Sequence, residues 1–394
     1  MDMQKQKVIP GKLFPVLFGF YVMGFVDIIG AATKYVKDDF NLSNSIANTL
    51  PLMVFVWFFI MSIPTGIIQD KIGRRKASCI GIGLTGLGMI IPLISYSFYS
   101  VIAGFILLGI GNTIVQVSLN PLMLFVSPAE KYTGFLSLSQ FIKAIASLLG
   151  PLITTAFFIY TQNWKYIFLV YAILSALSLL WLYFTYIEEH PQKEVRPTFK
   201  TSFKLLFSDK MVFLMVLGIF LSVGIDVGMN VSIPEYMGKK FSLSRESATN
   251  IISIYFAAKM TGTFLGSILL TRLSNRKFFI WTMVLTLLAF GGIYSGISKD
   301  FVISMIFIAG LGASNVFALI FSLTVQRMPE RSNELSGLMI MAVSGGAVIP
   351  LIMGFAVDVF GTNGNILILS LCAVYIFFLA TINISKKNIV NSTK

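Results

Sequence analysis

Four charged side chains lie within long apolar stretches of this 394-residue chain: Asp27, Lys143, Asp226 and Lys259. A charge at the centre of a membrane helix costs about 2.5–3.5 kcal/mol, so such groups face a cavity or pair with one another. One acid and one base fall in each half of the chain, and the simplest pairs are Asp27–Lys143 and Asp226–Lys259. A carboxylate that gains and loses an ammonium partner can release and take up a proton. We expect Asp27 first and Asp226 second to carry protons, with purely structural ion pairs as the alternative.

Uncharged polar residues extend this set, because several lie one helical turn from each other or from a charge. Gln116 and Asn120 share one face of a helix, and Gln140 and Lys143 share another. Such groups donate to and accept from hydroxyls, as a sugar requires, although amides also bond helices to each other. The residues expected to bind substrate are Asp27, Gln116, Asn120, Gln140, Lys143, Asn230, Lys259 and Asn315.

An enzymatic function is not expected. The only histidine, His190, falls in the longest polar stretch, and no arrangement of nucleophile and base is visible. Cys79 and Cys372 lie within or beside apolar stretches, which indicates neither a disulfide framework nor a metal site. We therefore expect no catalytic residue, metal or cofactor.

The elements that must position these side chains are membrane-spanning helices. Of all residues 56% are hydrophobic and 12% charged, and the mean hydropathy is +0.83. Each apolar stretch can cross roughly 30 Å of hydrocarbon as a helix, and none alternates as a barrel strand does. The sequence predicts an all-α polytopic membrane protein with twelve spans, at about 14–33, 48–68, 77–96, 98–126, 134–159, 164–187, 211–237, 249–271, 278–297, 300–326, 335–359 and 363–384.

The net charge of +13 follows the membrane topology and does not indicate nucleic-acid binding. If both termini are cytoplasmic, 21 of the 30 Lys and Arg residues fall in inner segments and 7 in outer ones, the others being Lys143 and Lys259. Lys and Arg mark cytoplasmic loops. The expected location is the inner membrane, with both termini in the cytoplasm and the lipid bilayer as the surrounding partner.

The chain divides into two similar halves. A polar segment at 188–210 separates six predicted spans in residues 1–187 from six in residues 211–394, and we expect it to be a cytoplasmic loop. Residues 35–77 show nine identities with the residues 201 positions later, including a shared Phe-x-Leu-Ser at Phe40 and Phe241. Repeats in the same orientation are typical of transporters whose substrate site lies between the halves at mid-membrane.

A short charged segment between the second and third spans is expected to form a tight turn at the cytoplasmic surface. It contains Gly66, Asp70, Gly73, Arg74 and Arg75. The pattern resembles Gly-x-x-x-Asp-x-x-Gly-Arg-x-Lys of the major facilitator superfamily, a resemblance that implies the major facilitator fold. In that superfamily the acid bonds to neighbouring helix ends, so we expect these five residues to form a cytoplasmic gate. The alternative is that the turn only sets topology.

Further segments resemble the fucose–galactose–glucose:proton symporter family of that superfamily. The resemblance is carried by span 11 from Ser336 to Asp358, with Gly345, Gly346 and Pro350, and by Asn120-Pro121 in span 4. It extends to parts of spans 1, 5, 7, 8 and 10. It implies a sugar importer driven by a proton gradient, in which an acid in span 1 matches Asp27 and a glutamine in span 5 matches Gln140.

The chain departs from that family at three positions. Gln116 stands where many members have glutamate, Lys143 where asparagine is usual, and Thr263 where span 8 carries arginine, with Lys259 one turn earlier. Two consequences remain open. Lys143 pairs with Asp27 and is freed when Asp27 is protonated, or Lys143 binds an acidic group of the substrate.

These observations predict a monomeric secondary transporter that imports a hexose or deoxyhexose with protons by alternating access. Na⁺ is the alternative coupling ion. The alternative functions are import of an acidic sugar through Lys143 and export of drugs or metabolites by the same fold.

Overall fold

The computed structural model describes residues 9–42, 46, 49–189, 198–243 and 245–382, and in these ranges every regular element is helical. The first bundle contains α1 (Pro10–Met23), η1 (Gly24–Ile28), α2 (Ile29–Asp39), α4 (Thr49–Ile72), α5 (Arg74–Ile94), α6 (Phe98–Val126), η2 (Ala129–Lys131), α7 (Tyr132–Thr161) and α8 (Tyr166–Phe184). The second contains α10 (Lys210–Phe241), α11 (Arg245–Leu269), α12 (Asn275–Ser295), α13 (Lys299–Ala313), α14 (Val316–Arg327), η3 (Pro329–Arg331), α15 (Ser332–Met341), η4 (Ala342–Ser344), α16 (Gly345–Phe360) and α17 (Asn363–Thr381). Helix α9 (Phe199–Ser208) lies in the segment expected to be a loop.

The described residues include twelve helical segments long and apolar enough to cross a membrane, which confirms the predicted number of spans. Some of these segments are not continuous α-helices. The first passes through the 3₁₀ turn η1, which contains Asp27. The tenth is interrupted at Ser314–Asn315, and the eleventh at η4. Helices broken near mid-membrane are common at transporter substrate sites.

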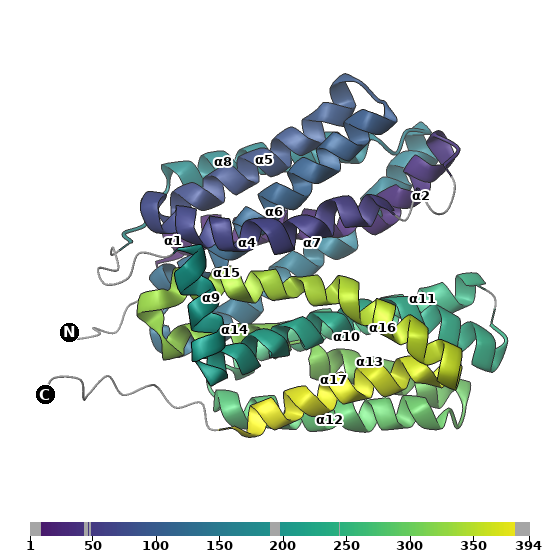
Figure 1. Cartoon of the computed structure of the whole chain (residues 1–394). Coiled ribbons are helices and arrows are strands. Elements are labelled where there is room, and N and C mark those ends of the chain that lie inside the picture. The colour runs from purple at the N-terminus through teal and green to yellow at the C-terminus, as the bar shows by residue number, and fades with distance from the viewer. Residues whose placement is uncertain (1–8, 43–45, 47–48, 190–197, 244, 383–394) are drawn as a thin grey trace, which may run out of the picture.

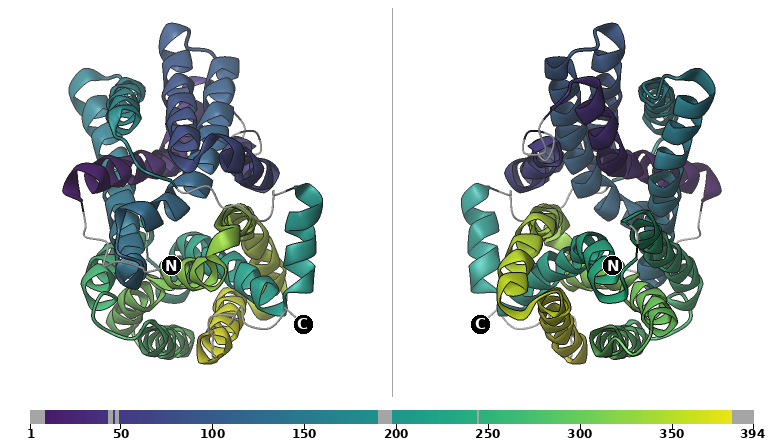
Figure 2. Two further views of the ribbon diagram at one scale, coloured as in Figure 1. Left: turned by 90° about the vertical axis from the view of Figure 1, so that its left-hand side faces the viewer. Right: turned by 90° about the vertical axis from the view of Figure 1, so that its right-hand side faces the viewer.

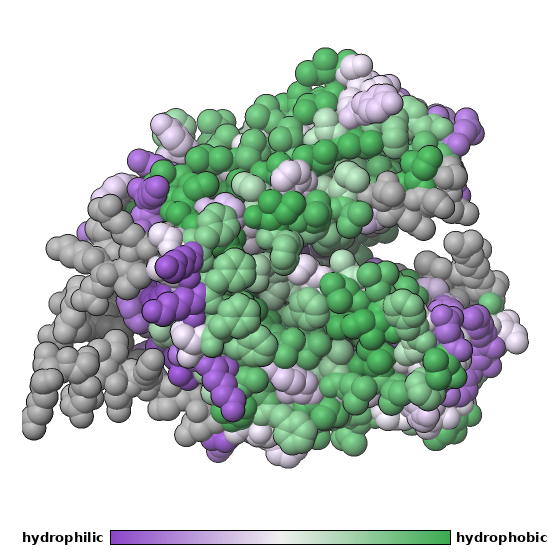
Figure 3. All heavy atoms as spheres, in the orientation of Figure 1, coloured by the Kyte–Doolittle hydropathy of each residue, from purple (hydrophilic) through white to green (hydrophobic). Residues whose placement is uncertain are grey.

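The two bundles lie side by side, and their long helices run in roughly the same direction (Figure 1). We call the end where α1 begins and α17 ends the terminal end. There α4 packs against α15, and α7 packs against α11 and α14. Figure 3 shows the halves in contact towards this end and a hollow between them at the other, which we call the open end. The structure is therefore closed at the terminal end and open at the opposite one.

Two positions of the predicted gate require glycine, each for a different physical reason. Helix α4 continues to Ile72 and α5 begins at Arg74, so the expected turn is reduced to Gly73, whose φ is 89° and ψ 152°. Only glycine adopts this backbone region without strain. Gly66 instead allows close helix packing, because an added Cβ there would lie 2.8 Å from the carbonyl oxygen of Asn333.

Replacing Gly73 with alanine should destabilise the protein by about 1–3 kcal/mol, the usual strain of a side chain in this region. Thermal unfolding of the detergent-solubilised protein measures the effect. Gly291→Ala is the matched control, because a Cβ there meets nothing within 4 Å and lies in regular helix. Equal unfolding temperatures for the two variants would show that the turn carries no strain.

At the open end of the first bundle, the end of α2 is fastened to the α5–α6 turn and to the start of α8. The Tyr96 hydroxyl donates to Asp39 Oδ2 at 2.5 Å, and the Trp164 indole donates to the same oxygen at 2.9 Å. Burial, together with the Asp39 carboxylate, raises the pKa of Tyr96 well above its usual value. The phenol therefore stays protonated and keeps donating this bond.

Candidate functional site

The second bundle contributes a charged cluster formed by α10 and α11. Lys259 Nζ lies 2.6 Å from Asp226 Oδ2, and the Tyr255 hydroxyl donates to Asp226 Oδ1 at 2.9 Å. The expected Asp226–Lys259 pair is thus formed. The two side chains are 30% and 20% exposed respectively, so the pair is partly open to solvent. Tyr255 lies one turn before Lys259 on α11, which is why both reach the same carboxylate.

Asp27 lies at the corresponding depth of the first bundle. It follows the start of α1 by 17 residues, and Asp226 follows the start of α10 by 16. At 1.5 Å per residue, both carboxylates lie about 25 Å along their helices. The two acids therefore occupy equivalent positions in the two halves.

The expected Asp27–Lys143 ion pair is wrong for this conformation: within the described part of the chain, Asp27 accepts a hydrogen bond from the Ser147 hydroxyl and forms no ion pair. The reason is the register of η1 against α7. An added Cβ at Gly24 would lie 2.5 Å from the Lys143 carbonyl oxygen, so Gly24 already packs at the level of Lys143. Asp27, three residues further along, reaches Ser147, which is one turn beyond Lys143.

Lys143 and Gln140 keep unused donors on the face of α7 that Ser147 shares. The half-buried Lys143 ammonium makes no hydrogen bond or ion pair with any residue that the structure describes. Gln140 Nε2 is buried and also has no partner there. Asn230, one turn after Asp226, is exposed. Among the described residues, Lys143 and Gln140 therefore hold unpaired donors in this conformation, and Asn230 is accessible.

Three other predicted binding residues are used by the protein itself. Gln116 Nε2 donates to Asn112 Oδ1 at 2.8 Å, and Asn120 Nδ2 donates to the Gln116 carbonyl at 2.7 Å. Asn315 Nδ2 donates to the Gly262 carbonyl at 2.8 Å, and its Oδ1 accepts from Ser137 of the other bundle. All three are buried. Their contact with substrate stays a prediction. In this conformation Gln116 and Asn120 bond within α6, whereas Asn315 joins α11 and α7.

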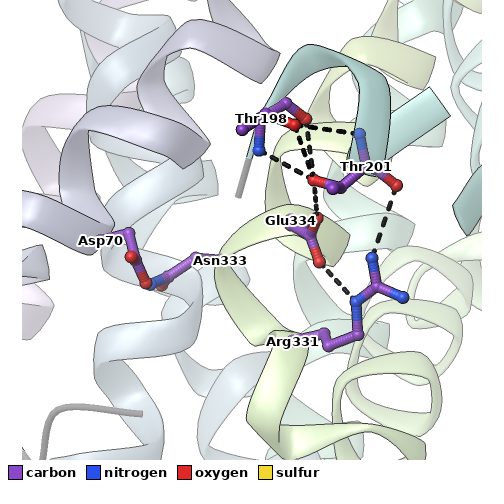
Figure 4. Close-up of polar contacts among 6 residues, drawn as sticks. All are labelled: Asp70, Thr198, Thr201, Arg331, Asn333 and Glu334. Atoms are coloured by element: carbon purple, nitrogen blue, oxygen red, sulfur yellow. Dashed lines mark hydrogen bonds and ion pairs between the residues drawn. The ribbon is translucent and has the colours of Figure 1, made fainter. Parts of the chain in front are cut away.

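The predicted gate residues lie at the terminal end, where Gly66, Asp70 and Arg74 meet α15 of the other bundle. Asn333 Nδ2 donates to Asp70 Oδ1 at 3.0 Å (Figure 4). The Arg74 guanidinium donates to Ser332 Oγ at 2.8 Å. Both bonds join the two halves and must break if this end opens.

Glu189 fixes the start of α5 within the first bundle. Its carboxylate accepts from the backbone N–H of Arg74 at 2.7 Å and of Arg75 at 2.9 Å. A carboxylate at a helix N-terminus is stabilised by the helix dipole. The Arg75 guanidinium donates to carbonyls at the end of α8, including that of Tyr183 at 2.6 Å. These bonds hold Arg74 in the position from which it reaches Ser332.

A second set of bonds connects α9 to the same part of α15. Glu334, next to Asn333, accepts from the Thr201 hydroxyl at 2.8 Å and from Arg331 Nε at 2.5 Å (Figure 4). Glu334 is buried. The start of α15 is therefore held by the first bundle through Asn333 and by the central segment through Glu334.

Replacing Asn333 with alanine should shift the equilibrium away from the state closed at the terminal end. A hydrogen bond to a charged group contributes about 1.5–3 kcal/mol, so the shift should be about tenfold or more. Distances between spin labels on α4 and α15, measured by electron–electron double resonance, report the populations. Asn163→Ala is the control, because the bonds of Asn163 among the described residues all lie near the open end of the first bundle. Unchanged distance distributions in Asn333→Ala would contradict a gating role for the contact.

Several residues of these clusters were not predicted as site residues: Ser147, Tyr255, Glu189, Ser332, Asn333, Glu334 and Thr201. Ser147 and Tyr255 are each four residues from a predicted charged residue, so helical spacing could have found them. Nothing local distinguishes Ser332 or Asn333, because their partners come from the other half.

The sequence matches a family model and is similar to a named transporter over most of its length. A sequence model described as Major Facilitator Superfamily matches residues 13–231 and 215–393. A candidate glucose/galactose transporter of Helicobacter pylori is 27% identical, with 92% of this chain and 94% of that protein covered.

Two solved structures show the same fold. The transporter FucP in the outward conformation has a TM-score of 0.82 at 18% identity, covering 94% of this chain and 98% of its own. The proton:xylose symporter XylE has a TM-score of 0.72 at 16% identity, covering 93% and 94%. The chain is similar throughout its length to multi-pass membrane transporters.

Proposed function

Because the chain belongs to the major facilitator superfamily, we propose that it is a secondary transporter that imports a monosaccharide together with protons. The observation that carries this proposal is the pair of accessible carboxylates, Asp27 and Asp226, at equivalent positions in the first span of each half. The name of the Helicobacter pylori relative supports a hexose such as glucose or galactose. The name of XylE supports coupling to protons.

The excess of Lys and Arg in the segments at the terminal end supports a cytoplasmic position for that end. The open end then faces outward, so the structure represents the state that receives external sugar. Rocking of the two bundles about the central site would open the terminal end and close the other. This motion requires the Asp70–Asn333 and Arg74–Ser332 bonds to break.

The two carboxylates have different roles in this proposal. Protonation of Asp226 would break its 2.6 Å ion pair and leave Lys259 without a counter-charge, which is costly within a membrane. Protonation of Asp27 breaks no ion pair, since its partner is the Ser147 hydroxyl. We therefore assign the proton to Asp27, and we assign Asp226, Lys259 and the exposed Asn230 to sugar hydroxyls.

The free ammonium of Lys143 favours a second candidate substrate, a sugar that carries a carboxylate. A cation without a counter-ion in a membrane cavity is expensive, and a uronate would supply the missing charge. Lys143 lies one turn from Ser147, which holds Asp27, so a bound carboxylate and the proton carrier would be close neighbours.

Uptake into proteoliposomes tests the function and separates these candidates. Purified protein is supplied with neutral hexoses or with hexuronates, with and without an inward proton gradient. Gradient-driven accumulation of neutral hexoses supports the first candidate. Preference for hexuronates that is lost in Lys143→Gln but kept in Lys131→Gln, a change at an exposed residue, supports the second. Absence of sugar uptake, with gradient-driven efflux of other solutes, would indicate an exporter instead.

A further inference from the structure

A pocket of about 660 Å³ lies at the terminal end of the second bundle, apart from the space between the halves. It is lined by the end of α9, the start of α10, the end of α14 with η3, and Ile382 beyond α17. Its cationic lining residues are Lys210, Arg327 and Arg331, and Asp209 is its one acidic lining residue. The lining therefore carries a net positive charge.

Arg327 has unused hydrogen-bonding capacity in this pocket. Its terminal nitrogen lies 3.6 Å from Asp209 Oδ2, and its Nε is buried without a hydrogen-bond partner. A buried N–H of a guanidinium without an acceptor is unusual. Arg331 is already engaged by Glu334, whereas Lys210 is exposed beside the pocket. An anionic oxygen group in the pocket would meet the partly exposed guanidinium of Arg327 and the ammonium of Lys210.

Helix α9 indicates what kind of molecule brings that group. It runs across the ends of the long helices at the edge of the bundle (Figures 1 and 2). Its inner face buries Leu205 and Leu206. Its outer face presents Phe199, Phe203 and Phe207, which are 53%, 41% and 72% exposed. A helix that lies in the membrane plane with aromatic residues outward inserts them at the boundary of headgroups and acyl chains.

We propose that this pocket binds the phosphate headgroup of an anionic phospholipid. Arg327 and Lys210 bind the phosphate, while Met211 and Leu214 on the pocket wall accommodate the beginning of an acyl chain. Basic pockets between membrane helices near the cytoplasmic surface are typical sites for anionic headgroups. The bound lipid connects α9 to α10 and α14, and so supports the helix whose Thr201 holds Glu334.

Thermal unfolding of the full-length protein in nanodiscs tests the proposal. Discs of phosphatidylcholine alone are compared with discs containing one-quarter phosphatidylglycerol, and with phosphatidylcholine discs in added inorganic phosphate. The proposal predicts a higher unfolding temperature with phosphatidylglycerol only. Equal stabilisation by inorganic phosphate would assign the pocket to a free anion and overturn the lipid proposal, as would the absence of any difference.

Variants test whether phosphatidylglycerol binds in this pocket. Its binding is measured by native mass spectrometry of phosphatidylglycerol adducts. Arg327→Gln and, separately, Lys210→Gln should each weaken retention about fivefold, the equivalent of roughly 1 kcal/mol per basic residue near an anionic surface. Arg327→Lys keeps the charge and should retain most binding. It therefore provides the test if Arg327→Gln disturbs folding. Arg276→Gln is the control, because Arg276 bonds to Thr381 at the same end but does not line the pocket. Equal loss in the control and the pocket variants would overturn the assignment.

Discussion

Asp27→Asn is expected to abolish proton-driven accumulation of sugar while counterflow continues. An asparagine keeps the size of the side chain and can still accept the Ser147 hydrogen bond, but it cannot take up a proton at neutral pH. If Asp27 also accepts a hydrogen bond from the sugar, loss of its charge weakens sugar affinity by about tenfold to a hundredfold, which saturating sugar overcomes. Accumulation under a proton gradient and sugar exchange at equal pH, both in proteoliposomes, measure the two activities.

Ser147→Ala and Asp27→Glu sharpen this experiment. Ser147→Ala removes the donor and keeps the acid, so coupled uptake should persist. Asp27→Glu keeps the titratable group and should retain part of the coupled activity. Equal loss of accumulation and counterflow in Asp27→Asn would mean that Asp27 binds substrate or supports the structure and does not carry the proton.

The second large effect is expected at the Asp226–Lys259 pair. Asp226→Asn leaves the Lys259 ammonium without its 2.6 Å partner. Loss of one member of a fully buried pair costs about 3–5 kcal/mol, and the partial exposure of this pair reduces the cost to about 1–3 kcal/mol. Asp226→Asn should therefore lower the unfolding temperature and strongly reduce transport.

The double variant Asp226→Asn/Lys259→Gln separates stability from function. A neutral amide pair leaves no unpaired charge, so stability should recover relative to either single variant. Transport should remain low, because a charged acceptor and donor for the sugar are both gone. Recovery of stability and transport together would show that the pair is only structural. Tyr255→Phe removes the second bond to Asp226 and should have a smaller effect than either charge removal.

The number of spans could be predicted because it follows from the properties of single helices in hydrocarbon. The second charged pair could be predicted because an acid and a base in the same half are costly there until they meet. Twelve apolar stretches must each cross the membrane, and Asp226 and Lys259 are costly in hydrocarbon unless they are paired or hydrated. Asp70 also bonds to the other half, but its partner Asn333 could be identified only from the structure.

The absence of the first charged pair could not be predicted, because the partner of Asp27 depends on the relative register of two helices. The absence of a side chain at Gly24 lets η1 pack directly against the backbone of α7, and this contact places Asp27 beside Ser147. Gln116, Asn120 and Asn315 show a related limit. Helical spacing tells which residues share a face, but tertiary packing decides whether that face meets the cavity or another helix.

The central claim is that inward sugar movement carries protons through Asp27, and pH recording in de-energised vesicles tests it most directly. Adding sugar outside vesicles that contain the protein should make the weakly buffered external medium more alkaline, as a proton enters with each sugar molecule. The signal should be absent in Asp27→Asn and independent of Na⁺. Sugar entry without alkalinisation, or alkalinisation that persists in Asp27→Asn, would contradict this account.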